Sequence, residues 1–176
     1  GAVNLSVLNL LDPQLIDDVA AALARHDLPA RTLDLEITES AVMTDPKGAI
    51  DTLTRLRAMG VGLSLDDFGT GYSSLAYLKR LPVDEIKIDR SFVMNLVSNG
   101  DDEAIVRSTI DLGRHLGLRI VAEGVEDLDS WDELVQLGCD VAQGFYLARP
   151  MPPAEVTSWL RARGAGAPPG DRFAHV

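Results

Sequence analysis

The stretch Thr32–Thr38, with the sequence TLDLEIT, indicates the fold class because it alternates apolar and polar residues. A period of two places Leu33, Leu35 and Ile37 on one face of an extended strand and leaves polar side chains on the other face. We therefore predict a half-buried β-strand here, with Glu36 on its polar face.

The same signal recurs on both sides of this strand, separated by segments with helical periodicity. Five further short apolar runs predict strands, at Ala2–Val7, Val61–Asp66, Glu85–Asp89, Leu118–Ala122 and Val141–Gly144. Apolar stripes at helical spacing lie in residues 15–23, 50–59, 105–116, 128–137 and 153–163, with a short helix near residues 74–81. This alternation predicts an α/β domain with a parallel sheet, either a closed barrel or an open doubly wound sheet.

The composition is that of an ordinary globular domain, with 176 residues that are 46% hydrophobic. The formal net charge of −11 argues against a groove for nucleic-acid polymers, because such a groove needs a basic surface. A single cysteine, Cys139, excludes an internal disulfide and a thiolate metal cage. No stretch approaches the roughly 20 apolar residues of a membrane span, so we expect no membrane contact from this chain.

The last residues differ from the rest of the chain. Residues 164–176 are rich in Gly, Ala and Pro and have no apolar period, so we expect a disordered tail after a domain that covers residues 1–163.

Polar side chains gather where the predicted strands end. Glu36 lies in the strand quoted above, the pair Asp66 and Asp67 follows the next strand, and Glu123 follows a later one. In parallel α/β folds, ligands and catalytic groups collect at this edge of the sheet. Adjacent carboxylates repel one another unless cations hold them, and carboxylates with the amide of Asn4 suit Mg²⁺ or Mn²⁺. The residues therefore indicate a two-metal site of the kind that cleaves phosphoesters.

Simpler explanations apply to single residues. Lys87 either complements such a metal centre or forms an ordinary ion pair with one neighbouring carboxylate. Acidic residues after strands also cap helices, which is how we interpret Asp45 and Asp127, with Asp101 or Asp102 capping a third helix.

Other motifs are less specific. Residues 69–74 contain Gly-x-Gly without the third glycine of a dinucleotide fingerprint, so they form either a glycine turn or a loop over the metal site. The three histidines lack the spacing of a metal pair, and Cys139 is expected in the core rather than as a nucleophile.

Six motifs occur together in one order and spacing. They are Asn4-Leu5-Ser6, Glu36-Ile37-Thr38-Glu39-Ser40, residues 66–74 (DDFGTGYSS), Ile86-Lys87-Ile88-Asp89, residues 122–126 (AEGVE) and Gln143-Gly144-Phe145. Over roughly residues 1–160 the chain resembles the EAL domain family, the cyclic-di-GMP phosphodiesterases that linearise this dinucleotide to 5′-pGpG. The resemblance implies a modified (β/α)8 barrel of the TIM type.

The resemblance also implies a role for each matching residue. Two divalent cations, Mg²⁺ or Mn²⁺, would be held by Asn4, Glu36, Asp66, Asp67 and Glu123. Lys87 would help to position and activate the attacking water, and Glu126 and Gln143 would complete the site. Glu39 would anchor the loop at residues 67–74, which in this family is linked to substrate binding and dimerisation.

One motif of the family is absent. The sequence contains no Glu-Ala-Leu, whose glutamate is another metal ligand in the family, and it begins at the strand that carries Asn4. We therefore expect an N-terminally incomplete barrel in this chain, with low stability and little activity unless another segment covers the gap. The longer parent is expected to carry further domains, such as a GGDEF or sensory domain.

These residues lead to one functional hypothesis and two rivals. We expect a metal-dependent cyclic-di-GMP phosphodiesterase, acting as a homodimer in second-messenger signalling and facing the cytoplasm, where the dinucleotide is made. A receptor or interaction module of the same fold would bind cyclic-di-GMP, or a partner protein, without cleavage. A different metal-dependent barrel enzyme would cleave another phosphoester. The presence of Lys87, Glu39 and Gln143 favours the phosphodiesterase, because a decayed receptor would have lost some of them.

Overall fold

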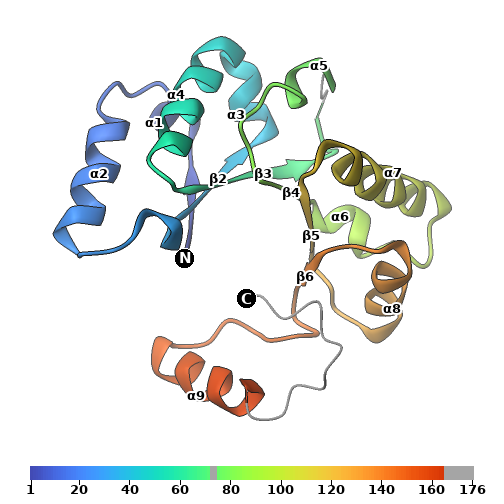
Figure 1. Cartoon of the computed structure of the whole chain (residues 1–176). Helices are drawn as coiled ribbons and strands as arrows, with labels where there is room; N and C mark the ends of the chain where they lie inside the picture. The colour runs from blue at the N-terminus through green and yellow to red at the C-terminus, as the bar shows by residue number, and fades with distance from the viewer. Residues whose placement is uncertain (72–74, 165–176) are drawn as a thin grey trace.

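A six-stranded parallel sheet forms the centre of the computed structural model, which describes residues 1–71 and 75–164 (Figure 1). The strands are β1 (Ala2–Leu5), β2 (Asp34–Thr38), β3 (Gly62–Phe68), β4 (Glu85–Ile88), β5 (Arg119–Glu123) and β6 (Val141–Gln143). All six strands predicted from the sequence are therefore confirmed, with boundaries that shift by one or two residues.

The order of the strands decides between the two architectures left open by the sequence. Each strand pairs with its neighbour in the chain, in the order β1-β2-β3-β4-β5-β6, and every pairing is parallel. A doubly wound sheet reverses its order at a switch point, whereas a (β/α)8 barrel keeps the sequential order seen here. The sheet is thus a six-stranded arc of a TIM-type barrel, and the doubly wound alternative is wrong.

Helices follow the strands, and most of them cover the outer side of this arc, whereas α9 lies apart from the sheet (Figure 1). They are α1 (Val7–Leu10), α2 (Leu15–Arg25), α3 (Glu39–Thr44), α4 (Pro46–Ala58), α5 (Leu75–Leu78), α6 (Arg90–Val93), α7 (Gly100–Leu116), α8 (Leu128–Leu137) and α9 (Pro153–Gly164), with a 3-10 turn at Ala30–Thr32. The helices α1, α3 and α6 were not predicted, because four to six residues are too few to show an apolar period.

Side-chain caps define where several helices begin. Asp45 accepts a hydrogen bond from the Gly48 N–H at 3.1 Å, and Asp127 accepts one from the Ser130 N–H at 2.7 Å, which confirms both predicted caps. The predicted cap at Asp101 or Asp102 is wrong. Helix α7 begins at Gly100, so Asn99 is the cap and its side chain accepts from the Asp101 N–H at 3.0 Å.

The two faces of the sheet differ in polarity. Leu35 and Ile37 of β2 are 2% and 0% exposed and pack in the hydrophobic core with helical residues such as Leu53. Glu36, between them in the sequence, projects from the opposite face, which is the inner side of the arc. The core therefore lies between sheet and helices, and the inner face remains for polar groups.

Some predictions lie beyond these ranges. The predicted tail falls outside the described residues from 165 onward, and Gly164 is the last residue of α9. Residues 72–74 of the predicted glycine loop also lie outside them. Among the described residues, no helix is long and apolar enough to cross a membrane.

Candidate functional site

The register of the parallel strands brings the predicted site residues to one edge of the sheet. Asn4 of β1 pairs with Glu36 of β2, and Glu123 of β5 pairs with Gln143 of β6. Asp66 pairs with Thr38 at the last position of β2. Residues more than 100 positions apart in the chain thus meet at the carboxyl edge, where the sequence placed them.

Lys87 is the centre of this cluster. Its Nζ lies 2.8 Å from Glu36 Oε1, 2.5 Å from Glu123 Oε1 and 3.4 Å from Asp66 Oδ1. The lysine side chain is 6% exposed, and the three carboxylate side chains are between 14% and 21% exposed. The simple ion pair considered for Lys87 is therefore replaced by a partly buried contact with three carboxylates from three strands.

The charges in this cluster are unbalanced, with one ammonium facing three carboxylates. Burial disfavours the charged lysine, but hydrogen bonds to Glu123 and Glu36 outweigh it and raise the pKa of Lys87 well above its usual range. Burial also raises the pKa of Glu123, although the contact with Lys87 opposes this. The excess of negative charge is what a divalent cation would neutralise.

A β-bulge brings the second aspartate of the pair into the site. Asp66 and Asp67 of β3 stand opposite the single residue Lys87 of β4, since Leu65 pairs with Ile86 and Phe68 pairs with Ile88. Asp67 has a left-handed backbone with φ 55°. On a regular strand, two successive side chains would face opposite sides, so the bulge is what allows both carboxylates to act at one edge.

Asp89 also belongs to this edge, although sequence reasoning gave it no role. Burial raises the pKa of Asp67, and the negative charges of Asp66 and Asp89 raise it further. Asp89 also caps α6 by accepting a hydrogen bond from the Ser91 N–H at 2.9 Å. The sequence already showed Asp89 at the end of a predicted strand, in the motif Ile86-Lys87-Ile88-Asp89.

Glu39 occupies a different position, one residue beyond β2 at the start of α3. It is 3% exposed, and neither of its carboxylate oxygens has a hydrogen-bond partner among residues 1–71 and 75–164. An ideal Cβ built on Gly71 would lie 3.0 Å from Glu39 Oε1, so the glutamate lies directly against the segment that begins with Gly69. Its predicted role as anchor of that segment remains a prediction.

The remaining site residues lie at the rim. The side chains of Asn4 and Gln143 are exposed at the ends of β1 and β6, and Glu126 is exposed three residues after Glu123. The structure thus brings Lys87 into contact with its carboxylates, and places these three residues at the same edge of the sheet.

The donor set fits a hard divalent cation in its chemistry. Three carboxylates converge within 3.4 Å of one cationic nitrogen, and oxygen donors of this type are those that Mg²⁺ and Mn²⁺ prefer. Within the described part of the chain, no group of three His, Cys, Asp or Glu side chains is drawn together closely enough to enclose an ion. The metal-binding roles of these residues are therefore taken up below as a proposal.

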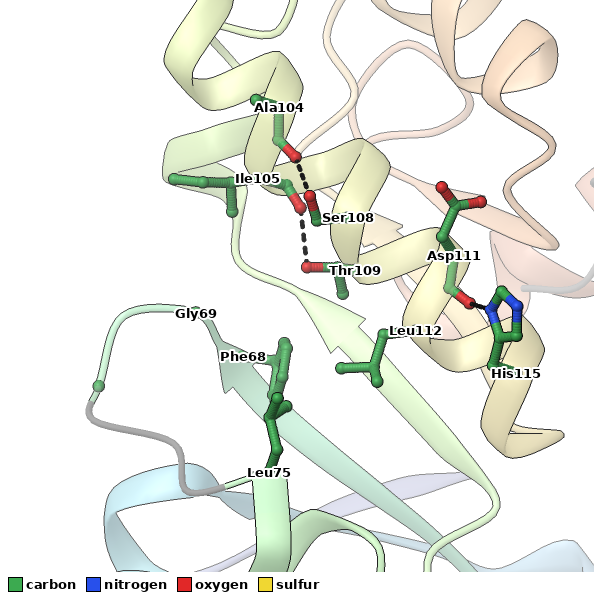
Figure 2. Close-up of a pocket in the computed structure, with 11 residues that line it drawn as sticks. Phe68, Gly69, Leu75, Ala104, Ile105, Ser108, Thr109, Asp111, Leu112 and His115 are labelled. Carbon is green, nitrogen blue, oxygen red and sulfur yellow. Dashed lines mark hydrogen bonds between the residues drawn. The ribbon is translucent and has the colours of Figure 1, made fainter.

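A separate groove lies beside the site, between the end of β3 and helix α7 (Figure 2). It has a volume of about 760 Å³, with Phe68 and Leu75 facing Ile105 and Leu112 across it. The hydroxyl of Thr109 is already bonded to the Ile105 carbonyl oxygen at 2.9 Å, so this groove offers mainly apolar surface.

Comparison with known sequences gives a consistent result. The EAL domain family model matches residues 1–150. The chain is 54% identical over 151 residues to the bifunctional diguanylate cyclase/cyclic di-GMP phosphodiesterase MucR of Pseudomonas aeruginosa, which covers 86% of this chain and 22% of MucR. It is 46% identical over 169 residues to the cyclic di-GMP phosphodiesterase NbdA of the same organism, covering 96% and 22%. The chain thus spans about a fifth of the length of these curated relatives.

Solved structures agree with the sequence relatives. The PaMucR phosphodiesterase in complex with c-di-GMP is similar with a TM-score of 0.85 and 53% identity, over 88% of this chain and 63% of that chain. BlrP1 of Klebsiella pneumoniae, in a manganese/cy-diGMP complex, is similar with a TM-score of 0.79 and 36% identity, over 85% of this chain and 38% of that chain. Both neighbours share the architecture that positions the carboxylate edge.

Proposed function

This chain belongs to the EAL domain family, and we propose that the complete gene product hydrolyses cyclic di-GMP to 5′-pGpG with two divalent cations, Mg²⁺ or Mn²⁺. The observation that carries the proposal is the convergence of Glu36, Asp66 and Glu123 on the ammonium of Lys87. Relatives with named cyclic di-GMP phosphodiesterase activity, and a manganese complex of a neighbour, support the choice of substrate and metal.

The chain offers several oxygen donors for the two cations. We assign Glu36, Asp66, Asp67 and Glu123 as carboxylate ligands, with the amide oxygen of Asn4 beside Glu36 in the register. Divalent cations in such a site polarise the phosphate and make a water molecule nucleophilic near neutral pH. The bulge at Asp66 and Asp67 supports this assignment, because it brings two adjacent carboxylates to one edge.

Lys87 contributes as a hydrogen-bond donor. Contacts with three carboxylates favour its charged form, and an ammonium group can donate but not accept. It therefore orients a water or a phosphate oxygen and offsets negative charge as the phosphodiester opens.

The remaining assignments concern residues outside the carboxylate cluster. Glu126 and Gln143 complete the rim of the site, and Glu39 supports the segment at Gly71. We further propose that the protein works in the cytoplasm as a homodimer, and that the gene product carries additional signalling domains.

Hydrolysis is tested on the purified complete gene product with cyclic di-GMP and Mg²⁺ or Mn²⁺, with pGpG measured by chromatography. Asp66→Ala should lower turnover at least about 100-fold, because it removes an oxygen donor at the centre of the cluster. Asp51→Ala, which removes an exposed carboxylate on α4, is the matched control and should retain full activity.

The same experiment separates the rival functions. A wild-type protein that binds cyclic di-GMP in calorimetry but forms no pGpG with either metal is a receptor, and the phosphodiesterase proposal is then refuted. Cleavage of a different phosphoester with no pGpG would assign the site to another metal-dependent reaction.

A further inference from the structure

The loop that follows β5 is joined to the end of β6 by hydrogen bonds between backbone groups. The Val125 N–H donates to the Gln143 carbonyl oxygen at 3.0 Å, and the Tyr146 N–H donates to the Val125 carbonyl oxygen at 3.0 Å. Val125 itself is 0% exposed. The loop after β5 is thus hydrogen-bonded, through both polar groups of one buried residue, to the end of β6.

Two glycines make this close approach possible. An ideal Cβ on Gly144 would lie 2.1 Å from the Val125 carbonyl oxygen and 2.4 Å from its nitrogen, and neither backbone atom can move independently of the loop. On the other side, Gly124 has φ 76°, and an ideal Cβ there would lie 2.5 Å from the Cβ of Arg90 in α6. We call residues Gly124, Val125 and Gly144 the Val125 clamp.

The clamp adjoins the carboxylate cluster on both strands that it joins. Glu123, which directly precedes Gly124, lies 2.5 Å from Lys87 Nζ. Gln143, which directly precedes Gly144, pairs with Glu123 in the register. Glu123 and Gln143 lie within two residues of the clamp along the chain. A displacement of the Val125 backbone would therefore also displace their side chains.

We propose that Gly144 and Gly124 are positioning residues, which let the Val125 backbone pack between β6 and α6 and thereby fix Glu123 where a divalent cation binds. The inference rests on the proposed function for its choice of ligand. Outer residues that orient a ligand typically change metal affinity 10- to 100-fold when they are altered. A glycine can exert the same control here, because its missing Cβ is what allows the backbone contact.

The test measures Mn²⁺ binding by calorimetry, without substrate, together with turnover over a range of Mn²⁺ concentrations in the complete gene product. Gly144→Ala should raise the Kd for Mn²⁺ by about 10- to 100-fold. Turnover should fall at low Mn²⁺ and recover in part at high Mn²⁺, a rescue that a general folding defect would not show.

Two glycines provide matched controls. An ideal Cβ on Gly113 would lie 2.1 Å from Ile120 Cδ1, the same separation as in the clamp but within the core between α7 and β5. Gly113→Ala should lower the unfolding temperature and leave the Kd for Mn²⁺ unchanged. Gly100→Ala introduces a methyl group into open space and should change neither quantity.

The outcomes are distinguishable. Unchanged Mn²⁺ affinity in a folded Gly144→Ala variant overturns the inference, as does an equal loss of affinity in Gly113→Ala. If Gly144→Ala does not fold, the same comparison is made with Gly124→Ala and decides the question. A wild type that binds Mn²⁺ but forms no pGpG refutes the phosphodiesterase alone, and one that binds no Mn²⁺ refutes both.

Discussion

Replacement of Lys87 by methionine is the perturbation that probes the carboxylate cluster most directly. Methionine fills a similar volume, so Lys87→Met removes the ammonium while it keeps most of the buried side-chain volume at this position. Without the lysine, Glu36, Asp66 and Glu123 converge on one another with no cation among them. In the absence of metal, the variant should therefore be markedly less stable than the wild type.

The size of the effect follows from burial and charge. Lys87 is 6% exposed and its partners are at most 21% exposed, so water screens the remaining carboxylates only in part. Removal of one partner of a buried ion pair costs about 3–5 kcal/mol. For a domain of this size, 1 kcal/mol corresponds to about 2–4 °C in Tm, so the midpoint should fall by about 6–20 °C. Relief of the cost of burying the ammonium reduces this figure, whereas repulsion among three carboxylates increases it.

The assay is thermal and urea unfolding of the complete gene product, first with a chelator and then with Mg²⁺. Added Mg²⁺ should restore more stability to Lys87→Met than to the wild type, because the ion replaces the missing positive charge. Lys47→Met, at an exposed position in the first turn of α4, should stay within about 0.5 kcal/mol of the wild type. If Lys87→Met unfolds within about 1 kcal/mol of the wild type in chelator, the three carboxylates do not depend on the lysine and the reasoning is wrong.

Two further predictions concern residues away from the site. Burial raises the pKa of Cys139 to about 12, so its thiolate is scarce at pH 8, and the thiol should react with a disulfide reagent only after unfolding in urea; rapid labelling of the folded protein would contradict its place in the core. Asn99→Ala should destabilise α7 by about 1 kcal/mol because it removes the cap, whereas Asp101→Ala should cost at most about 0.5 kcal/mol. Equal urea midpoints for these two variants would argue against the cap at Asn99.

Much of the fold could be predicted because each strand carries its own local signal. The alternation at Thr32–Thr38 and the apolar runs around it were sufficient to place six strands, and the helical segments between these strands indicated parallel pairing. The cap of α7 was missed because Asn99, Asp101 and Asp102 are all good capping residues. Which of the three is the cap depends on where the helix begins, and the sequence does not specify a helix boundary to within one or two residues.

The sequence predicted which residues form the site more readily than it predicted which of them contact one another. Carboxylates at successive strand ends suggested a shared centre, because the carboxyl ends of parallel strands lie at one edge. The sequence did not indicate that Lys87 of β4 would contact three of them at once, since that depends on the stagger of β2, β3 and β5 relative to β4. Asp89 stands in one of the quoted motifs but was given no role, and its cap of α6 is a local explanation for an aspartate after a strand.

The pair Asp66 and Asp67 shows where local pattern and site geometry conflict. A regular strand would send one carboxylate into the inner face and the other toward the helices, where a buried charge without a partner is costly. The bulge removes this conflict by setting both residues opposite Lys87, and it places Asp67 at φ 55°, a conformation that aspartate tolerates better than most residues. A backbone of this kind persists only when its surroundings hold it, and such outliers are concentrated at functional sites. The left-handed backbone at Asp67 is therefore consistent with the proposed use of both carboxylates at one edge of the sheet.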